Sequence, residues 1–224
     1  MRDLNVSDHR TKHRARSGAL AIALAAASML QMSQSAHADG IRPPDVPADI
    51  QVPAGNVVFL KGAAVGTQNY ACSPSGTGFA WVLFTPQATL FNRADKQIMT
   101  HFFSPNPDPS DPNTDPAVLA AGAIRPTWQA RDTSSVWAKA APSSRPVVVR
   151  PDALPWLLLE VVGRQEGPTG GDTLTSTTFI QRVNTVGGLA PSTGCAQSSD
   201  VGKKAFVPYT ADYYFYESVD ATDY

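Results

Sequence analysis

One histidine and two acids are the residues of this sequence best suited to acid–base chemistry. His101 is the only histidine after residue 38, so a Ser-His-Asp arrangement in that part of the chain would need it as the base. Asp132 and Glu160 are the acids that we consider as its partners. No Gly-x-Ser-x-Gly turn supplies a nucleophilic serine, and a lone histidine followed by Phe102 and Phe103 is more often structural. The enzyme hypothesis therefore requires His101 to lie within hydrogen-bonding reach of an acid inside a cleft.

A second group of residues has the types expected in a ligand-binding site. Trp128 and Trp137 could form a platform under a sugar ring or another planar molecule, with Arg131 and Asp132 as hydrogen-bonding groups beside them. Tryptophan is as often a core residue, and an aspartate that opens a Thr-Ser-Ser segment is well explained by an Asx-turn. Asn184 precedes a pair of glycines and lies either in a tight turn or in a loop at the mouth of a binding site.

Glu160 lies within the apolar run Trp156–Val162, where an unpaired charge is costly to bury. We expect it to form an ion pair with Arg182 or Arg164, and the alternative is a carboxylic acid with a raised pKa. The paired carboxylates of a glycoside hydrolase are not identifiable in the sequence.

The sequence predicts neither a metal nor a cofactor. One histidine and two distant cysteines lack the ligand spacing of a zinc site. Asp108, Asp111 and Asp115 lie in a proline-rich loop without the Asp-x-Asp-x-Asp-Gly pattern of a calcium loop. The nearest match to a dinucleotide-binding Gly-x-Gly-x-x-Gly turn, at residues 76–81, ends in tryptophan and enters a predicted strand.

The elements that position these residues are predicted to be strands. All 19 prolines lie after residue 38, and their scatter excludes long helices. Short apolar or alternating runs separated by Gly, Pro, Asn and Ser indicate an all-β single domain, an antiparallel sandwich or barrel of about ten short strands. The runs are Val57–Leu60, Thr67–Cys72, Phe79–Phe84, Thr89–Phe91, Gln97–Phe103, Trp128–Ala130, Val136–Ala138, Val147–Arg150, Trp156–Val162, Thr175–Asn184 and Tyr213–Val219.

Two of these strands carry a clear burial pattern. Trp156–Val162 is almost continuously apolar, which is typical of a strand that is buried on both faces. In Thr175–Asn184, alternation places Phe179, Gln181 and Val183 on one face, and Ile180, Arg182 and Asn184 on the other.

The domain itself is expected to span residues 54–224. Residues 39–53 form a proline-rich leader that we expect to lie extended across the domain surface. Ser104–Pro116 contains five prolines and is predicted to be a long loop, and Ala117–Ala121 is predicted to form one helical turn.

Residues 1–38 have the pattern of a secretory signal peptide. Five basic residues precede the apolar run Gly18–Leu30, and Ala36-His37-Ala38 is a small-x-small cleavage site. This segment holds five of the 18 basic and two of the 19 acidic residues, which leaves 13 basic and 17 acidic residues in the rest of the chain. A net charge of −4 argues against a nucleic-acid binder. We expect a protein without a membrane span, exported to the periplasm or the medium.

Two cysteines, Cys72 and Cys195, lie in the exported part of the chain. An even count in an oxidising compartment predicts one disulfide, which would span 123 positions, and two free thiols are the alternative.

Six phrases in consistent order resemble a known family. The chain is similar, from about Val52 to Tyr216, to the secreted family catalogued as domain of unknown function 3455, which occurs in bacteria and fungi. This resemblance implies a single secreted domain, agrees with pairing of Cys72 with Cys195, and implies no activity. The phrases are Val65–Cys72, Phe79–Leu90, Thr127–Trp137, Leu154–Leu159, Ile180–Cys195 and Val207–Tyr216.

Three functional hypotheses follow. The leading one is a secreted, disulfide-linked β protein that binds a glycan, a small molecule or a component of the cell envelope. The second is a hydrolytic or lyase-type enzyme that uses His101 with an acid. The third is a structural surface protein without a pocket, which the absence of any concavity would favour.

Overall fold

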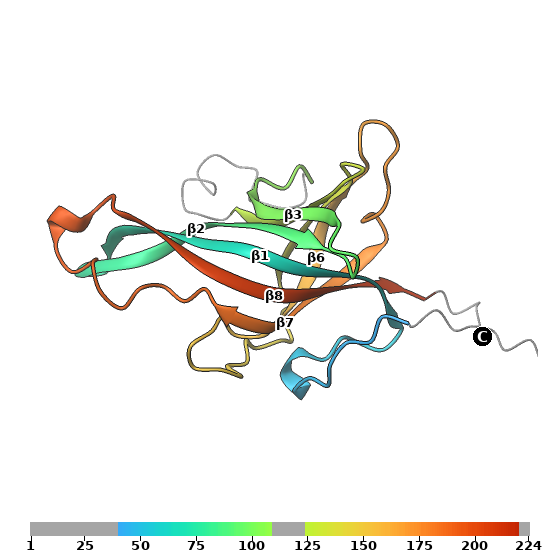
Figure 1. Cartoon of the computed structure of the whole chain (residues 1–224), viewed down its shortest axis with the longest axis horizontal. Helices are drawn as coiled ribbons and strands as arrows, with labels where there is room; N and C mark the ends of the chain where they lie inside the picture. The colour runs from blue at the N-terminus through green and yellow to red at the C-terminus, as the bar shows by residue number, and fades with distance from the viewer. Residues whose placement is uncertain (1–39, 109–123, 220–224) are drawn as a thin grey trace, which may run out of the picture. The chain divides into compact units, whose positions relative to one another are not determined.

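The computed structural model describes residues 40–108 and 124–219, which form an eight-stranded closed antiparallel β-barrel. Each strand pairs with the next along the chain, and β8 pairs with β1 to close the barrel (Figure 1). The all-β prediction is therefore confirmed, with the barrel as the architecture. The strands are β1 Asn56–Ser75, β2 Gly78–Phe91, β3 Gln97–Ser104, β4 Arg125–Ala130, β5 Ser135–Ala140, β6 Leu157–Gln165, β7 Thr177–Gly187 and β8 Lys204–Ser218.

The strands are fewer and longer than expected. Two pairs of predicted runs merge into β1, with 20 residues, and β2, with 14 residues. Gly62 and Gly66, which look like strand breaks in the sequence, lie inside β1 because β2 approaches it closely there. A Cβ on Gly62 would overlap the side chain of Leu90, and one on Gly66 would overlap the backbone of Gln87.

Other predicted segments differ in smaller ways. The Val147–Arg150 run forms only a single bridge, between Val147 and Trp156. The helical turn predicted at Ala117–Ala121 and residues 109–116 of the predicted loop lie outside the described residues.

Two layers of apolar side chains stabilise the barrel. One fills the interior, where Leu159 and Ile180 pack with Phe215. The other lies outside the wall, where Leu158 and Val183 pack under the leader. The two-sided burial of β6 is confirmed, and the predicted alternation of β7 is confirmed as far as Val183; Asn184, predicted on the same face as Ile180, lies outside because the register shifts there.

The proline-rich leader is attached to the outside of β6, β7 and β8. It contains a single 3₁₀ turn, η1 (Ala48–Ile50), whose Ile50 side chain is fully buried in the outer apolar layer. The Gln181 side-chain amide donates a hydrogen bond to the Ile50 carbonyl oxygen at 2.8 Å, and the Tyr216 hydroxyl donates to the Gln181 amide oxygen at 3.1 Å. These contacts fix the leader on the barrel wall.

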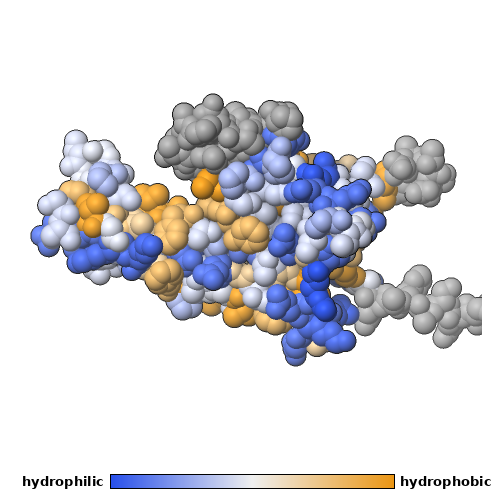
Figure 2. All heavy atoms as spheres, turned by 90° about the horizontal axis from the view of Figure 1, so that it is seen from above, coloured by the Kyte–Doolittle hydropathy of each residue, from blue (hydrophilic) through white to orange (hydrophobic). Residues whose placement is uncertain are grey.

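Three strands continue beyond the barrel as an arm, made of β1 residues 67–75, β2 residues 78–87 and β8 residues 204–208 (left side of Figure 1). The neighbouring ladders are shorter, because β2 pairs with β3 only from Ala88 to Phe91, and β7 pairs with β8 only as far as Gly187 and Tyr209. Figure 2 shows apolar surface along this arm. The exposed apolar side chains there include Val82, Phe84 and Phe206.

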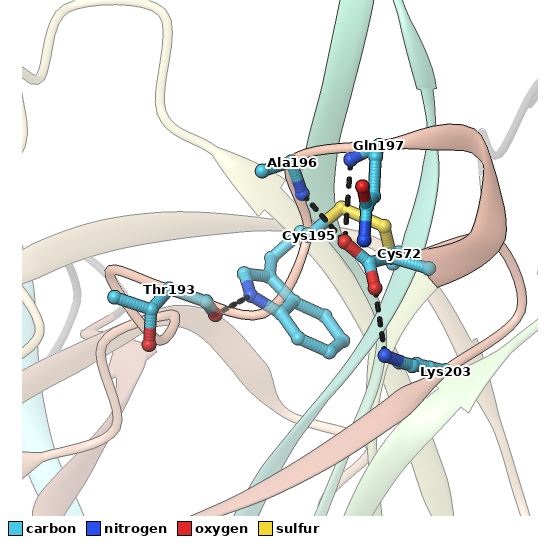
Figure 3. Close-up of a disulfide and its surroundings, with 8 residues drawn as sticks. Cys72, Thr193, Cys195, Ala196, Gln197 and Lys203 are labelled. Atoms are coloured by element: carbon cyan, nitrogen blue, oxygen red, sulfur yellow. Dashed lines mark hydrogen bonds and ion pairs between the residues drawn. A yellow bond between two sulfur atoms is a disulfide. The ribbon is translucent and has the colours of Figure 1, made fainter.

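The predicted disulfide between Cys72 and Cys195 is present and joins the arm to the connection between β7 and β8 (Figure 3). The Cα atoms of the two cysteines are 5.4 Å apart. Beside the bond, the Trp81 indole donates to the Thr193 carbonyl oxygen at 2.8 Å. The Asp200 carboxylate, in the 3₁₀ turn η3 (Ser198–Asp200), accepts hydrogen bonds from the backbone N–H groups of Ala196 and Gln197 and from Lys203 Nζ.

The ladder between β2 and β3 is short, and a side-chain contact replaces it toward the arm. Beyond the pair Ala88–His101, the Phe103 N–H donates to Thr85 Oγ1 at 3.0 Å, and the Thr85 hydroxyl donates to the Pro86 carbonyl oxygen at 2.8 Å. We call this place the β2–β3 seam. A surface hollow of about 630 Å³ lies over it.

A candidate binding cavity inside the barrel

A cavity of about 250 Å³ lies inside the barrel at the end from which the arm projects. Toward this cavity, the inward-facing residues of the strands change from aliphatic to aromatic or polar. Examples are the change from Met99 to His101 on β3 and from Ile180 to Arg182 on β7. Its lining combines one cation, one imidazole, one amide and several rings. The lining residues are Gln68, Leu83, Pro86, His101, Phe103, Pro126, Trp128, Leu157, Leu159, Arg182 and Tyr213.

Stacked aromatic rings form one wall of the cavity. His101 on β3 and Trp128 on β4 are cross-strand partners, and their rings lie parallel with centroids 4.1 Å apart. The Tyr213 ring is tilted against both, at centroid distances of 5.3 Å from His101 and 5.4 Å from Trp128. Aromatic pairs in such geometries hold one another in fixed orientations.

The His101 imidazole is neutral near pH 7. Burial lowers the pKa of His101 to about 3, and the nearby charge of Arg182 acts in the same direction, whereas the hydrogen bond to Thr127 opposes the shift. His101 Nδ1 lies 2.8 Å from the Thr127 carbonyl oxygen. Because a carbonyl oxygen only accepts, Nδ1 carries the hydrogen, and Nε2 keeps a lone pair as an acceptor.

Arg182 brings a positive charge to the cavity. It lies on β7 between Leu157 of β6 and Tyr213 of β8, and its Nη2 donates to the Pro155 carbonyl oxygen at 3.0 Å. Its Nε is buried and has no hydrogen-bond partner among the described residues. The same holds for Nε1 of Trp128, so two of the residues that line the cavity each have a buried N–H group without an acceptor in the described part of the chain.

Trp137 lies on the other side of the barrel wall from Trp128. In the ladder of β4 and β5, Trp128 pairs with Val136, and Trp137 pairs with Thr127. Side chains of adjacent residues in a strand point to opposite faces, so the two indoles do not form one platform. The Trp137 Nε1 instead donates to Ser104 Oγ at 2.8 Å on the outside.

Arg131 and Asp132 lie in the turn between β4 and β5, at the end of the barrel away from the arm. The Asp132 carboxylate accepts hydrogen bonds from the N–H and hydroxyl groups of both Ser134 and Thr173. Although burial acts to raise the pKa of Asp132, these four bonds hold it well below its usual value. The Asx-turn interpretation of Asp132 therefore describes its contacts, and Arg131 is exposed to solvent.

Glu160 and Asn184 also lie away from the cavity lining. Glu160 is half-buried on β6 between Lys139 and Phe179 of the neighbouring strands. Arg164 donates to the Thr177 carbonyl oxygen and Arg182 to that of Pro155, so neither makes the expected ion pair with Glu160 in the described structure.

Asn184 has a left-handed backbone with φ of 52°, and its side-chain amide donates to Asp212 Oδ2 at 2.9 Å. It therefore lies on the outside of the barrel, where β7 and β8 change register. Across residues 40–108 and 124–219 there is no cluster of three or more His, Cys, Asp or Glu residues suited to a metal ion. No helix in these residues is long and apolar enough to cross a membrane.

Sequence reasoning missed the role of Arg182 and Gln68 in the cavity. A usable signal was present for Arg182, because the alternation of β7 places it on the same face as Ile180, a core residue. An arginine at a core-facing position of a strand indicates a polar pocket or a partner. Gln68 offered no comparable signal, since its burial depends on the arm strands around it.

These features define a single class of protein, an eight-stranded antiparallel β-barrel domain with an aromatic-lined cavity in its interior. Residues 53–217 match the family described as protein of unknown function, DUF3455, and the chain belongs to that family. Comparison with curated proteins and with solved structures found no match.

Proposed function

We propose that this protein is a secreted binding protein that holds a small, flat organic molecule in the barrel cavity. The observation that carries the proposal is that two residues lining the cavity, Trp128 and Arg182, each have a buried N–H donor (Nε1 and Nε) without an acceptor among the described residues. A buried donor left without a partner costs about 1–3 kcal/mol. Acceptors on a bound molecule would remove that cost for both groups.

The volume and the walls of the cavity limit the ligand. A volume of about 250 Å³ corresponds to roughly eight water molecules at ~30 Å³ each, which suits an organic molecule of about a dozen non-hydrogen atoms. A glycan of that size is a single sugar ring. The rings of His101, Trp128 and Tyr213 pack against one another as an aromatic wall, which favours a planar or ring-shaped molecule.

The surroundings of His101 favour binding over acid–base catalysis. Its Nδ1 is occupied by a backbone carbonyl oxygen, whereas a catalytic histidine of the Ser-His-Asp type is oriented by a carboxylate. A pKa of about 3 also leaves it a weak base at neutral pH.

Export is part of the same proposal. The signal-peptide pattern of residues 1–38 predicts secretion, with a mature chain that starts at Asp39 and comprises the leader and a single domain. The Cys72–Cys195 disulfide supports an oxidising compartment such as the periplasm or the extracellular medium.

A thermal-shift experiment tests the binding proposal. Indole, phenol, benzamide, benzoate and methyl glucoside are each titrated into the oxidised wild-type protein. A probe at 100 times its Kd raises the free energy of unfolding by about 2.7 kcal/mol. We expect at least one of them to raise the Tm.

A cavity-blocking variant shows where the probe binds. Leu157→Trp fills the cavity, and Val148→Trp adds the same indole at an exposed position, so Val148→Trp is the matched control. The shift should disappear in the first variant and persist in the second. No shift with any probe in the wild type, or an equal shift in both variants, would contradict binding in the barrel.

A further inference from the structure

We propose that the cavity binds an anion, specifically a small planar carboxylate whose charge pairs with the Arg182 guanidinium. This inference rests on the proposed function, because it names the chemical class of the molecule that the barrel would hold.

The charge of the cavity is not compensated by any carboxylate among the described residues. Among the eleven lining residues, Arg182 is the only one with a permanent charge, and none is a carboxylate. The His101 ring is neutral near pH 7, since burial lowers its pKa to about 3. The described structure shows no ion pair that includes Arg182. Arg182 is half-buried and its guanidinium has no counterion among the described residues, so an anionic ligand would supply one.

The field of Arg182 reaches several side chains around the cavity. Its charge lowers the pKa of His101 and acts to lower the pKa of Tyr70 and Tyr209, although burial is the larger effect for both tyrosines and raises their pKa. The tyrosines are therefore neutral at physiological pH and do not neutralise the arginine. An anion that enters the cavity meets a positive potential with no competing negative group from the lining residues.

The free donors are of the kind from which a carboxylate accepts. Arg182 uses Nη2 for the Pro155 carbonyl oxygen, which leaves its Nε–H as a donor, and Trp128 Nε1–H is a second one. A carboxylate has two oxygen atoms that accept from such groups, and guanidinium–carboxylate pairs are among the strongest hydrogen bonds in proteins. A ligand of about a dozen non-hydrogen atoms that carries a carboxylate is of the size of a benzoate ring with small substituents.

The stacked rings favour a flat ligand body beside that charge. His101 and Trp128 lie within 11° of parallel, and Tyr213 presents a tilted ring to both. Leu83, Leu157 and Phe103 supply apolar surface around them. An aromatic carboxylate therefore matches both the polar and the apolar parts of the lining.

The test compares two probes of equal shape, benzoate and benzamide, by calorimetric titration of the oxidised full-length protein. We expect the wild type to bind benzoate at least tenfold more tightly than benzamide. Arg182→Gln should remove this preference. Arg131→Gln is the matched control, because it removes the same charge from an exposed turn at the other end of the barrel, and it should keep the preference.

The outcomes separate this inference from the proposed function. If benzoate and benzamide bind with equal affinity, or benzamide binds more tightly, the anion inference is refuted and binding in the barrel stands. If no probe binds, both fail. The wild-type ratio needs no variant, so it decides the matter even if Arg182→Gln does not fold. Arg182→Lys, which keeps the charge, should retain a reduced preference, and a preference lost in Arg182→Lys but kept in Arg182→Gln would also refute the inference.

Discussion

Removal of the Cys72–Cys195 disulfide should destabilise the protein through its unfolded state. The bond closes a loop of 123 positions, and chain-entropy reasoning values a loop of that length at about 5 kcal/mol. The native geometry around it has other support, because the Cys72 N–H donates to the Lys203 carbonyl oxygen and the Gly202 N–H donates to that of Cys72, both at 2.9 Å. We therefore expect the double variant Cys72→Ser/Cys195→Ser to fold and to lose about 3 kcal/mol, within the measured range of 2–5 kcal/mol.

Urea unfolding followed by circular dichroism measures this loss. For a chain of this size, about 3 kcal/mol corresponds to a drop in Tm of roughly 6–12 °C. The dependence of the unfolding free energy on urea should also steepen, since the unlinked unfolded chain exposes more surface. Wild-type protein treated with a reductant is the control and should match the double variant. An unchanged urea midpoint in the double variant would refute the reasoning, because the loop constraint would then contribute nothing.

Two further predictions concern His101 and the leader. The pKa of His101 is about 3 in the folded protein and 6.5 in the unfolded chain, so the unfolded state binds an extra proton between these values and stability falls as the pH falls from 6.5 toward 3. Between pH 6.5 and 5, the free energy of unfolding of the wild type should fall by up to about 1.4 kcal/mol per pH unit. His101→Gln should flatten this dependence in urea unfolding. Equal slopes for the variant and the wild type would contradict this prediction. Ile50→Ala should lower the free energy of unfolding in urea by about 3 kcal/mol, because it empties a fully buried site under the leader. Val148→Ala, at an exposed site, is the control and should change it by less than about 0.5 kcal/mol. Equal effects of the two substitutions would show that the leader contributes little to stability.

The fold class and the disulfide could be predicted because they depend on composition and on local pattern. Scattered prolines exclude long helices wherever they occur, and the period-two alternation of β7 is visible in the sequence itself. Strand number could not be predicted in the same way. In the sequence, Gly62 and Gly66 look like the ends of strands. They lie inside one strand because Leu90 and Gln87 of the neighbouring strand pack closely against them, and this contact is not visible in the sequence.

Sequence reasoning named Trp128, which lines the candidate cavity, but paired it with Trp137, which lies on the other face of the barrel wall. Trp128 and Trp137 are close in sequence, but the length of the turn between β4 and β5 decides which face each one takes, and that turn is set by the contacts of Asp132. Arg182 was visible as an inward-facing residue. Its relation to Trp128 depends on closure of the barrel, which brings β7 and β4 to the same cavity, and no local pattern encodes that closure.

The β2–β3 seam has a consequence for how fast the cavity can exchange its contents. Pro86 and His101 line both the outer hollow of about 630 Å³ and the inner cavity, so the wall between them is thin at this place. Beyond the pair Ala88–His101, the hydrogen bond from the Phe103 N–H to Thr85 Oγ1 joins the two strands at the seam. A ligand that passed through the seam would have to break this contact, so we expect the Thr85 hydroxyl to affect the residence time of the ligand, whereas other groups set its affinity.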